Sequence, residues 1–251
     1  NEVSLTVGAG IRKTYFEKQG TGSAAAMQMT NPIKFDYRPL FNEGKNYGTF
    51  LIPGLLAIIL QQTLLIGLSA ATAEEREKNT LKKLLARNSL SEIIFGKGLF
   101  YWLVFMIYGM FFITVNFSLL SAAFRGNYLH LFILTGIFIG SIISLAMLVG
   151  TFFKTTLMAF QVMGFSSYPI FMITGYSLPT QALPAIIQWI SYCIPTTPFL
   201  KAYTSIVFAG GTLSQNSGHL VHLIVLWVIL NLLLVWRLGY LKRQREATIG
   251  F

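Results

Sequence analysis

Residues that could serve as nucleophiles or metal ligands are few in this sequence of 251 residues. His219 and His222 are close in sequence but stand at the edge of an apolar stretch. Together with His130 they lack the cysteine and carboxylate company of a zinc site. Cys193 lies in an apolar run with no histidine near it in sequence, so it is not expected to be a nucleophile. The sequence therefore predicts no catalytic residue and no metal site.

A nucleotide-binding motif is also missing from the sequence. The stretch Gly10-Ile-Arg-Lys13-Thr14 superficially resembles a phosphate-binding loop, but it lacks the glycine directly before the lysine and the required spacing. We interpret it as a turn. A Gly-x-Ser-x-Gly nucleophile elbow is absent as well. We therefore expect a protein that is not an enzyme and that holds no cofactor in this chain.

The composition excludes an ordinary water-soluble globule. Hydrophobic residues make up 54% of the chain and charged residues only 11%, whereas about a quarter of an average soluble domain is charged. So apolar a chain is not disordered either, because disorder requires low hydrophobicity. In a membrane protein, the formal net charge of +10 indicates basic cytoplasmic loops rather than nucleic-acid binding.

Five stretches are long and apolar enough to cross a membrane, which takes about 20 residues each. Their interiors contain no Asp, Glu, Lys or Arg, and Arg237 lies at the end of the last one. The fold class predicted is therefore an all-α polytopic membrane protein. The expected spans are Phe50–Ala71, Leu99–Ala123, Leu129–Gly150, Thr155–Leu178 and His219–Leu238.

Basic residues predict how these spans are oriented. With five spans, 72–98, the turn at Lys154 and the tail after Arg237 share one side, and that side holds eleven of the 19 Lys and Arg residues. Because basic loops remain in the cytoplasm, we expect a cytoplasmic C-terminus, external residues 1–49, and a membrane domain over 50–251.

The external placement of residues 1–49 has a consequence of its own. Such a segment needs a signal peptide or an earlier span, and the sequence starts at Asn1 with neither. We expect a truncated chain whose intact form has six spans; a removed signal peptide is the alternative. Val3, Leu5 and Val7 alternate with polar residues, which predicts a short strand.

The loop over 72–98 contains two capping-box patterns. Thr72 with Glu75 fits the first and predicts either the start of a helix or an extension of the preceding span. Ser89 with Glu92 fits the second and predicts the start of the next helix. A short cytoplasmic helix within 72–92 is therefore expected between two spans.

This short helix is predicted to be amphipathic. Leu81, Leu84 and Leu85 share one face, and basic residues lie largely off it. Basic amphipathic helices commonly lie on anionic lipid headgroups. Three glutamates within 74–77 argue against simple lipid docking and favour a protein partner.

The connection over 179–217 is predicted to be external although it is strongly apolar. Pro179, Pro184, Pro195 and Pro198 divide it into pieces too short to span a membrane. We expect a short amphipathic or re-entrant helical hairpin at the outer surface. It would serve as an outer lid or as a peripheral anchor, and the sequence does not decide between the two.

Polar residues inside the spans are costly in lipid unless they are paired. They are expected either to join helices by hydrogen bonds or to line a substrate pathway. Asn116 and Asn231 are further polar residues inside the spans. The candidates for the pathway are Gln61, Gln62, Gln161, Ser166, Ser167 and Tyr168.

Small residues at four-residue spacing mark the third span. Gly136, Gly140 and Ser144 form this row, and such rows allow helices to pack closely. The packing would occur within the chain or across a dimer.

Taken together, these motifs resemble the permease subunits of ABC transporters of the type-2 exporter class, which includes drug, polysaccharide and lipid exporters. The resemblance runs from about residue 45 to the end. Asn79 stands where the family more commonly has Gly, and the family's first span is absent. The matching residues are Leu51-Ile-Pro53-Gly54, Glu75-Arg76-Glu77, Thr80-Leu81, Leu84-Leu85, Glu92-Ile93, Gly96-Lys97, Ile194-Pro195, Pro198 and Gly210-Gly211.

The resemblance implies a permease that works with a second permease copy, in a homo- or heterodimer, and with cytoplasmic ATP-binding subunits that bind ATP and Mg²⁺. The helix over 75–87 would be a coupling helix. Its leucines Leu81, Leu84 and Leu85 would fill a pocket of the ATPase. Glu75, Arg76 and Glu77 would form ion pairs with it. The full set of coupling residues is Glu75, Arg76, Glu77, Thr80, Leu81, Leu84 and Leu85.

The function expected is ATP-driven export of an amphiphilic drug, lipid or polysaccharide-type substrate across the inner membrane. The alternatives are an ATPase-independent channel or carrier, and a non-transporting membrane anchor or assembly protein. A carrier would need a charged or carbonyl-rich site at the middle of the membrane, and the sequence shows none.

Overall fold

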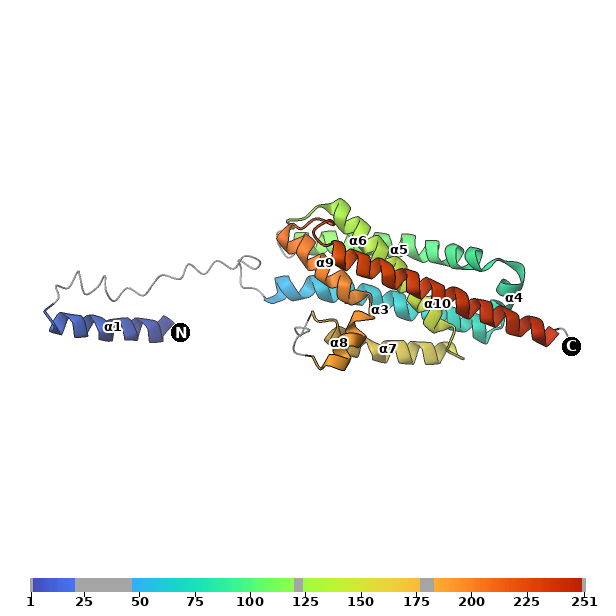
Figure 1. Cartoon of the computed structure of the whole chain (residues 1–251), viewed down its shortest axis with the longest axis horizontal. Coiled ribbons are helices and arrows are strands. Elements are labelled where there is room, and N and C mark those ends of the chain that lie inside the picture. Colours follow the sequence, from blue (N-terminus) through green and yellow to red (C-terminus); the bar gives the residue numbers. More distant parts are fainter. Residues whose placement is uncertain (1, 21–46, 120–123, 177–182, 250–251) are drawn as a thin grey trace. The chain divides into compact units, whose positions relative to one another are not determined.

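The computed structural model describes residues 2–20, 47–119, 124–176 and 183–249. The chain divides into two units, residues 1–45 and 46–251. In the first unit, α1 (Glu2–Lys18) is a helix (Figure 1), so both the strand predicted at Val3–Val7 and the turn predicted at Gly10–Thr14 are wrong. Three alternating residues are a weak signal, and the helix continues past them to a Lys13–Glu17 ion pair one turn apart, at 3.7 Å.

Among the described residues of the second unit, five helices are long and apolar enough to cross a membrane. This confirms the predicted all-α polytopic fold. Several boundaries differ from the prediction. Helix α3 continues to Glu77 rather than Ala71, and α10 continues to Ile249 rather than Leu238. Helix α5 begins at Leu90 rather than Leu99, and α7 ends at Ile173. Residues 120–123 and 177–182, at the ends of two predicted spans, lie outside the described residues. The five helices are α3 (Tyr47–Glu77), α5 (Leu90–Leu119), α6 (Tyr128–Gly150), α7 (Thr156–Ile173) and α10 (Ser217–Ile249).

Helix α6 forms the centre of this bundle. It packs against α3 and α10 along much of its length and also against α5 and α9 (Figure 1). Leu131, Leu134 and Ile142 are fully buried, and no charged residue occurs in this helix. A helix that is apolar on all sides must be surrounded by other helices, which explains why α6 occupies the interior.

The described part of this unit also contains three shorter helices: α4 (Thr80–Arg87), α8 (Ala185–Tyr192) and α9 (Thr196–Ala209). Helix α4 connects α3 to α5 and contacts α10 near one end of the bundle, and α9 packs against α6, α10 and α3 (Figure 1). Arg125 N–H donates to Val207 O at 3.0 Å, so the α5–α6 connection lies beside the C-terminal part of α9. The end with α4 and the end with this connection are therefore opposite ends of the bundle.

Candidate coupling site and polar contacts between the spans

The junction between α3 and α4 is a tight turn at Asn79. The backbone of Asn79 has a φ of 58° and lies in the left-handed region, which asparagine tolerates better than most non-glycine residues. Thr72 lies inside α3 and donates its hydroxyl to Leu68 O at 2.8 Å. The first capping-box pattern therefore does not start a helix; its other interpretation, an extension of the preceding span, is confirmed.

The second capping box is confirmed. Ser89 N–H donates to Glu92 Oε2 at 2.9 Å, and Glu92 N–H donates to Ser89 Oγ at 3.2 Å. This reciprocal pair satisfies two backbone donors that the first turn of a helix leaves free. It fixes the start of α5, so the helix predicted within 72–92 is limited to Thr80–Arg87.

Helix α4 is amphipathic as predicted. Leu81 and Leu85 are only 3% and 1% exposed, and Leu84 is half-buried. This apolar side packs against α3, α5 and α10 of the same chain. A partner that contacts α4 therefore meets the opposite side of the helix. The exposed residues on that side are Lys82, Lys83, Ala86 and Arg87.

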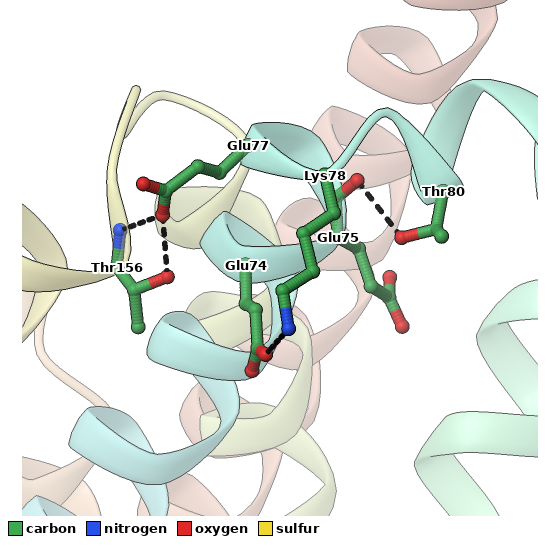
Figure 2. A network of polar contacts seen from close by, with 6 residues as sticks. All are labelled: Glu74, Glu75, Glu77, Lys78, Thr80 and Thr156. Carbon is green, nitrogen blue, oxygen red and sulfur yellow. Dashed lines mark hydrogen bonds and ion pairs between the residues drawn. The ribbon is translucent and has the colours of Figure 1, made fainter.

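Two ion pairs flank the end of α3, and they differ in what they connect. Glu74 and Lys78 pair one turn apart on the exposed surface (Figure 2), and this contact with Glu74 raises the pKa of Lys78. Glu75 pairs with Lys97 of α5, and both side chains are more than three-quarters buried. The second pair therefore links two spans, whereas the first is local.

Arg76 and Glu77 reach the turn between α6 and α7. Arg76 donates to Thr151 O at 2.7 Å and to Phe153 O at 3.2 Å, just beyond the C-terminus of α6. Glu77 accepts from the N–H and the hydroxyl of Thr156, at 2.8 and 2.7 Å (Figure 2). Thr156 is the first residue of α7. Each side chain therefore carries the charge that the adjoining helix end favours.

Polar residues of α3 join it to two other helices. Thr196, at the start of α9, donates its hydroxyl to Gln61 Oε1, and Gln61 is 1% exposed. Gln62 Nε2 donates to Ser167 Oγ of α7 at 2.7 Å. Both contacts match the interpretation of these residues as helix-joining groups. Gln61 Nε2 and Gln62 Oε1 are buried without a hydrogen-bond partner.

The other pathway candidates lie elsewhere on α7. Gln161 is exposed and Tyr168 is 70% exposed, so neither faces the contact with α3. Ser166 donates to Met163 O of its own helix at 2.7 Å. The structure therefore brings together Gln62 and Ser167, and separately Gln61 and Thr196. The side chain of Asn116 lies outside the described residues, and Asn231 donates to Trp227 O at 2.9 Å.

The small-residue row of α6 is buried within the chain. A Cβ at Gly136 would lie 3.2 Å from the ring of Trp102, and one at Gly140 would lie 3.0 Å from the ring of Trp227. Ser144 donates its hydroxyl to Gly140 O at 3.0 Å. The glycines therefore make room for indole rings of α5 and α10.

The apolar connection forms two unlike helices. In α8 the apolar residues Ile186 and Trp189 are each 75% exposed, while Ser191 is buried and hydrogen-bonded to Thr197 at 3.0 Å. In α9 the rings of Phe199 and Tyr203 are buried. Helix α9 is therefore part of the bundle, and α8 turns its apolar side outward. Residues 179–182 of the predicted hairpin lie outside the described residues.

Several contacting residues were not identified from the sequence. Thr151 directly follows α6, and Thr156 and Thr196 are the first residues of α7 and α9. Nothing in the sequence around them indicated a contact with α3. Lys97 was part of the family motif, but its pairing with Glu75 depends on how α3 and α5 pack. Contacts between residues this far apart in the chain arise from tertiary packing.

Comparison with known proteins agrees with this architecture. Residues 9–236 match the family model described as "ABC-2 family transporter protein". The chain is 27% identical over 216 residues to "Probable multidrug ABC transporter permease YbhS" of Escherichia coli K12, covering 85% of this chain and 56% of that protein. It is 26% identical over 164 residues to "Probable multidrug ABC transporter permease YbhR" of the same organism, covering 64% and 44%.

The chain thus spans about half the length of the curated relatives it matches. No solved structure matches it. The family match covers most of the chain, including α3, α5, α6 and α7 in full and α10 as far as Trp236. The chain therefore belongs to the ABC-2 family of transporter proteins, as a membrane-spanning member of the permease type.

Proposed function

We propose that this chain is the permease subunit of an ATP-driven exporter and that α4 docks on a cytoplasmic ATP-binding subunit. The observation that carries the proposal is the pair of faces on α4. Its leucines anchor the helix to α3, α5 and α10, while Lys82, Lys83 and Arg87 project outward at one end of the bundle. A helix held in this way presents a defined charged surface, which suits a protein partner with acidic groups. The partner binds ATP and Mg²⁺, and this chain binds neither.

The proposed orientation places the α4 end in the cytoplasm. The charged residues of the described bundle gather there, including four glutamates between 74 and 92, whereas Arg125 and Lys201 occur toward the opposite end. Basic residues near span ends remain on the cytoplasmic side. The multi-pass chain then has an external α8 and α9, and residues 1–49 are external as well.

The proposed substrate is an uncharged or amphiphilic small molecule of the kind exported by multidrug transporters. The two relatives are named as probable multidrug transporter permeases, and this favours a drug-like substrate over a lipid or a polysaccharide. The spans support it, because outward-facing residues of α5 and α7 are apolar or aromatic, as at Tyr108, Phe165 and Tyr168. The exposed polar residues of α7, Gln161 and Tyr168, would line the route.

A second permease copy completes the proposed transporter. Helices α5 and α7 are largely unburied within the chain, so their faces are covered by lipid or by another copy. Because polar Gln161 and Tyr168 lie on the exposed side of α7, we assign that side to the interface between two copies. Substrate would pass between them.

Co-purification with the ATP-binding subunit tests the proposed function. The double variant Lys82→Glu, Lys83→Glu reverses two outward charges and leaves the buried leucines intact. We expect it to lose the ATPase, and Lys82→Arg, Lys83→Arg to retain it. Absence of an ATPase from well-folded wild-type protein would instead favour a channel, a carrier or a membrane anchor.

A further inference from the structure

Three consecutive residues at the end of α3 contact three different spans. Glu75 pairs with Lys97 of α5. Arg76 donates to the carbonyl groups that follow α6, and Glu77 accepts from the first residue of α7. We call Glu75, Arg76 and Glu77 the α3 clamp. All three side chains are occupied within the chain, so a partner's ion pairs are not needed to explain them.

The charges of the clamp match the helix ends that they contact. Helix α6 ends and α7 begins within five residues, so a partial negative end and a partial positive end lie close together. Arg76 contacts the first and Glu77 the second. Two adjacent residues of α3 with opposite charges therefore both bind the short α6–α7 turn.

Helix α4 follows the clamp directly. Only Lys78 and Asn79 separate Glu77 from Thr80, the first residue of α4, and Thr80 donates its hydroxyl to Glu75 O at 3.1 Å. Figure 2 shows Thr80 beside Glu75, with Glu77 turned toward Thr156 on the other side. Helix α4 is therefore joined directly to the last turn of α3, which carries the clamp.

We propose that the α3 clamp is a set of positioning residues that makes α5, α6 and α7 move together with α4. The role in coupling rests on the proposed function above, whereas the clamp itself requires no partner. In this arrangement the ATPase contacts the basic side of α4, and the clamp transmits the displacement to the spans. The clamp determines how much transport accompanies each ATP hydrolysed, and it does not determine whether the ATPase binds.

A charge-exchange experiment distinguishes a role of the clamp in coupling from a role in binding the ATPase. Glu75→Lys or Lys97→Glu alone places like charges together, and the double variant Glu75→Lys, Lys97→Glu restores an opposite pair. We expect transport per ATP to fall by at least about fivefold, the lower range for coupling between sites, in each single variant and to recover in the double. Glu74→Lys is the matched control, because its partner Lys78 is on the same exposed helix end; it should leave transport unchanged. Loss of the bound ATPase in the single variants, or failure of the double to recover, would overturn the proposal.

A distance measurement tests the clamp without the ATPase. In a Cys193→Ser background, spin labels at Lys83→Cys and Lys154→Cys report the separation of α4 from the α6–α7 turn, since both residues are exposed. Glu77→Ala should broaden or shift this distance. Glu77→Gln, which keeps an oxygen that can accept from Thr156, should largely restore it. An unchanged distribution in Glu77→Ala would overturn the clamp, and this result would stand whether or not an ATPase binds the wild type.

Discussion

Gly150 of α6 lies directly against Ser69 of α3. A Cβ at Gly150 would be 2.7 Å from Ser69 O and 3.0 Å from Ser69 Cα, distances that a side chain cannot adopt unless the backbone moves. Gly150 is also the last residue of α6, one position before Thr151, whose carbonyl accepts from Arg76. The close approach of α3 and α6 therefore occurs beside the α3 clamp.

Gly150→Ala should destabilise the bundle. Overpacking a tight interior site typically costs about 1–3 kcal/mol, and here the obstacle is backbone rather than a flexible side chain. We expect a lower midpoint of thermal unfolding in detergent. The matched control is Gly164→Ala in α7, where no atom lies within 4 Å of the added Cβ. Equal stability of the two variants would contradict the close contact of α3 with α6.

Asn79 should tolerate glycine but not alanine. Its φ of 58° is left-handed, and its side chain makes no cap hydrogen bond to α4, so the backbone conformation decides the outcome. That conformation costs about 1–2 kcal/mol for an ordinary L-residue, and glycine adopts it freely. Asn79→Gly should match wild type in thermal unfolding and Asn79→Ala should unfold earlier.

The control for Asn79 is Lys82→Ala, three residues further on in α4. Lys82 is exposed and helical, so alanine should be neutral for folding there. If Lys82→Ala and Asn79→Ala lower the unfolding temperature equally, the left-handed backbone at Asn79 is not what makes alanine unfavourable there.

The sequence predicted the long helices well because their signal is local. Spans follow from apolar length, and the start of α5 follows from Ser89 and Glu92, which lie three residues apart. The same local information placed Leu81, Leu84 and Leu85 on one face of α4. It could not tell that this face packs onto the chain's own helices, since amphipathicity does not identify the surface that covers it.

The predicted roles of the polar residues depended on packing that the sequence does not encode locally. Glu75, Arg76 and Glu77 were assigned to a partner, yet each contacts a residue more than twenty positions away. The strand predicted at Val3–Val7 was wrong for a different reason. Three alternating residues are too short a pattern to outweigh the longer helical segment that contains them.

The hydrogen bond between Gln62 and Ser167 should appear as an energetic coupling of α3 with α7. In a double-mutant cycle with Gln62→Met and Ser167→Ala, measured by unfolding in detergent or bicelles, we expect an interaction energy of about 0.6 kcal/mol and at most about 1.7, the range found between membrane helices. The hydroxyl of Ser167 retains Gly164 O as an acceptor, which keeps the single variants mild.

Ser166 provides the control for this cycle. Its hydroxyl donates to Met163 O within α7, so Gln62→Met and Ser166→Ala should be additive. A coupling for Ser166 as large as that for Ser167 would indicate that the Gln62 side chain lies differently along α7.

Cys193 is the single cysteine of the sequence and is exposed, at the C-terminal end of α8. Because the basic residues around α4 predict that the α4 end is cytoplasmic, Cys193 should react with a membrane-impermeant maleimide in intact cells. The variant Lys83→Cys in a Cys193→Ser background should react only after the cells are permeabilised, and Cys193→Ser alone should not react. Labelling of Lys83→Cys in intact cells would show that the α4 end is external, the opposite of the predicted orientation. A cytoplasmic ATPase could then not reach the basic surface of α4.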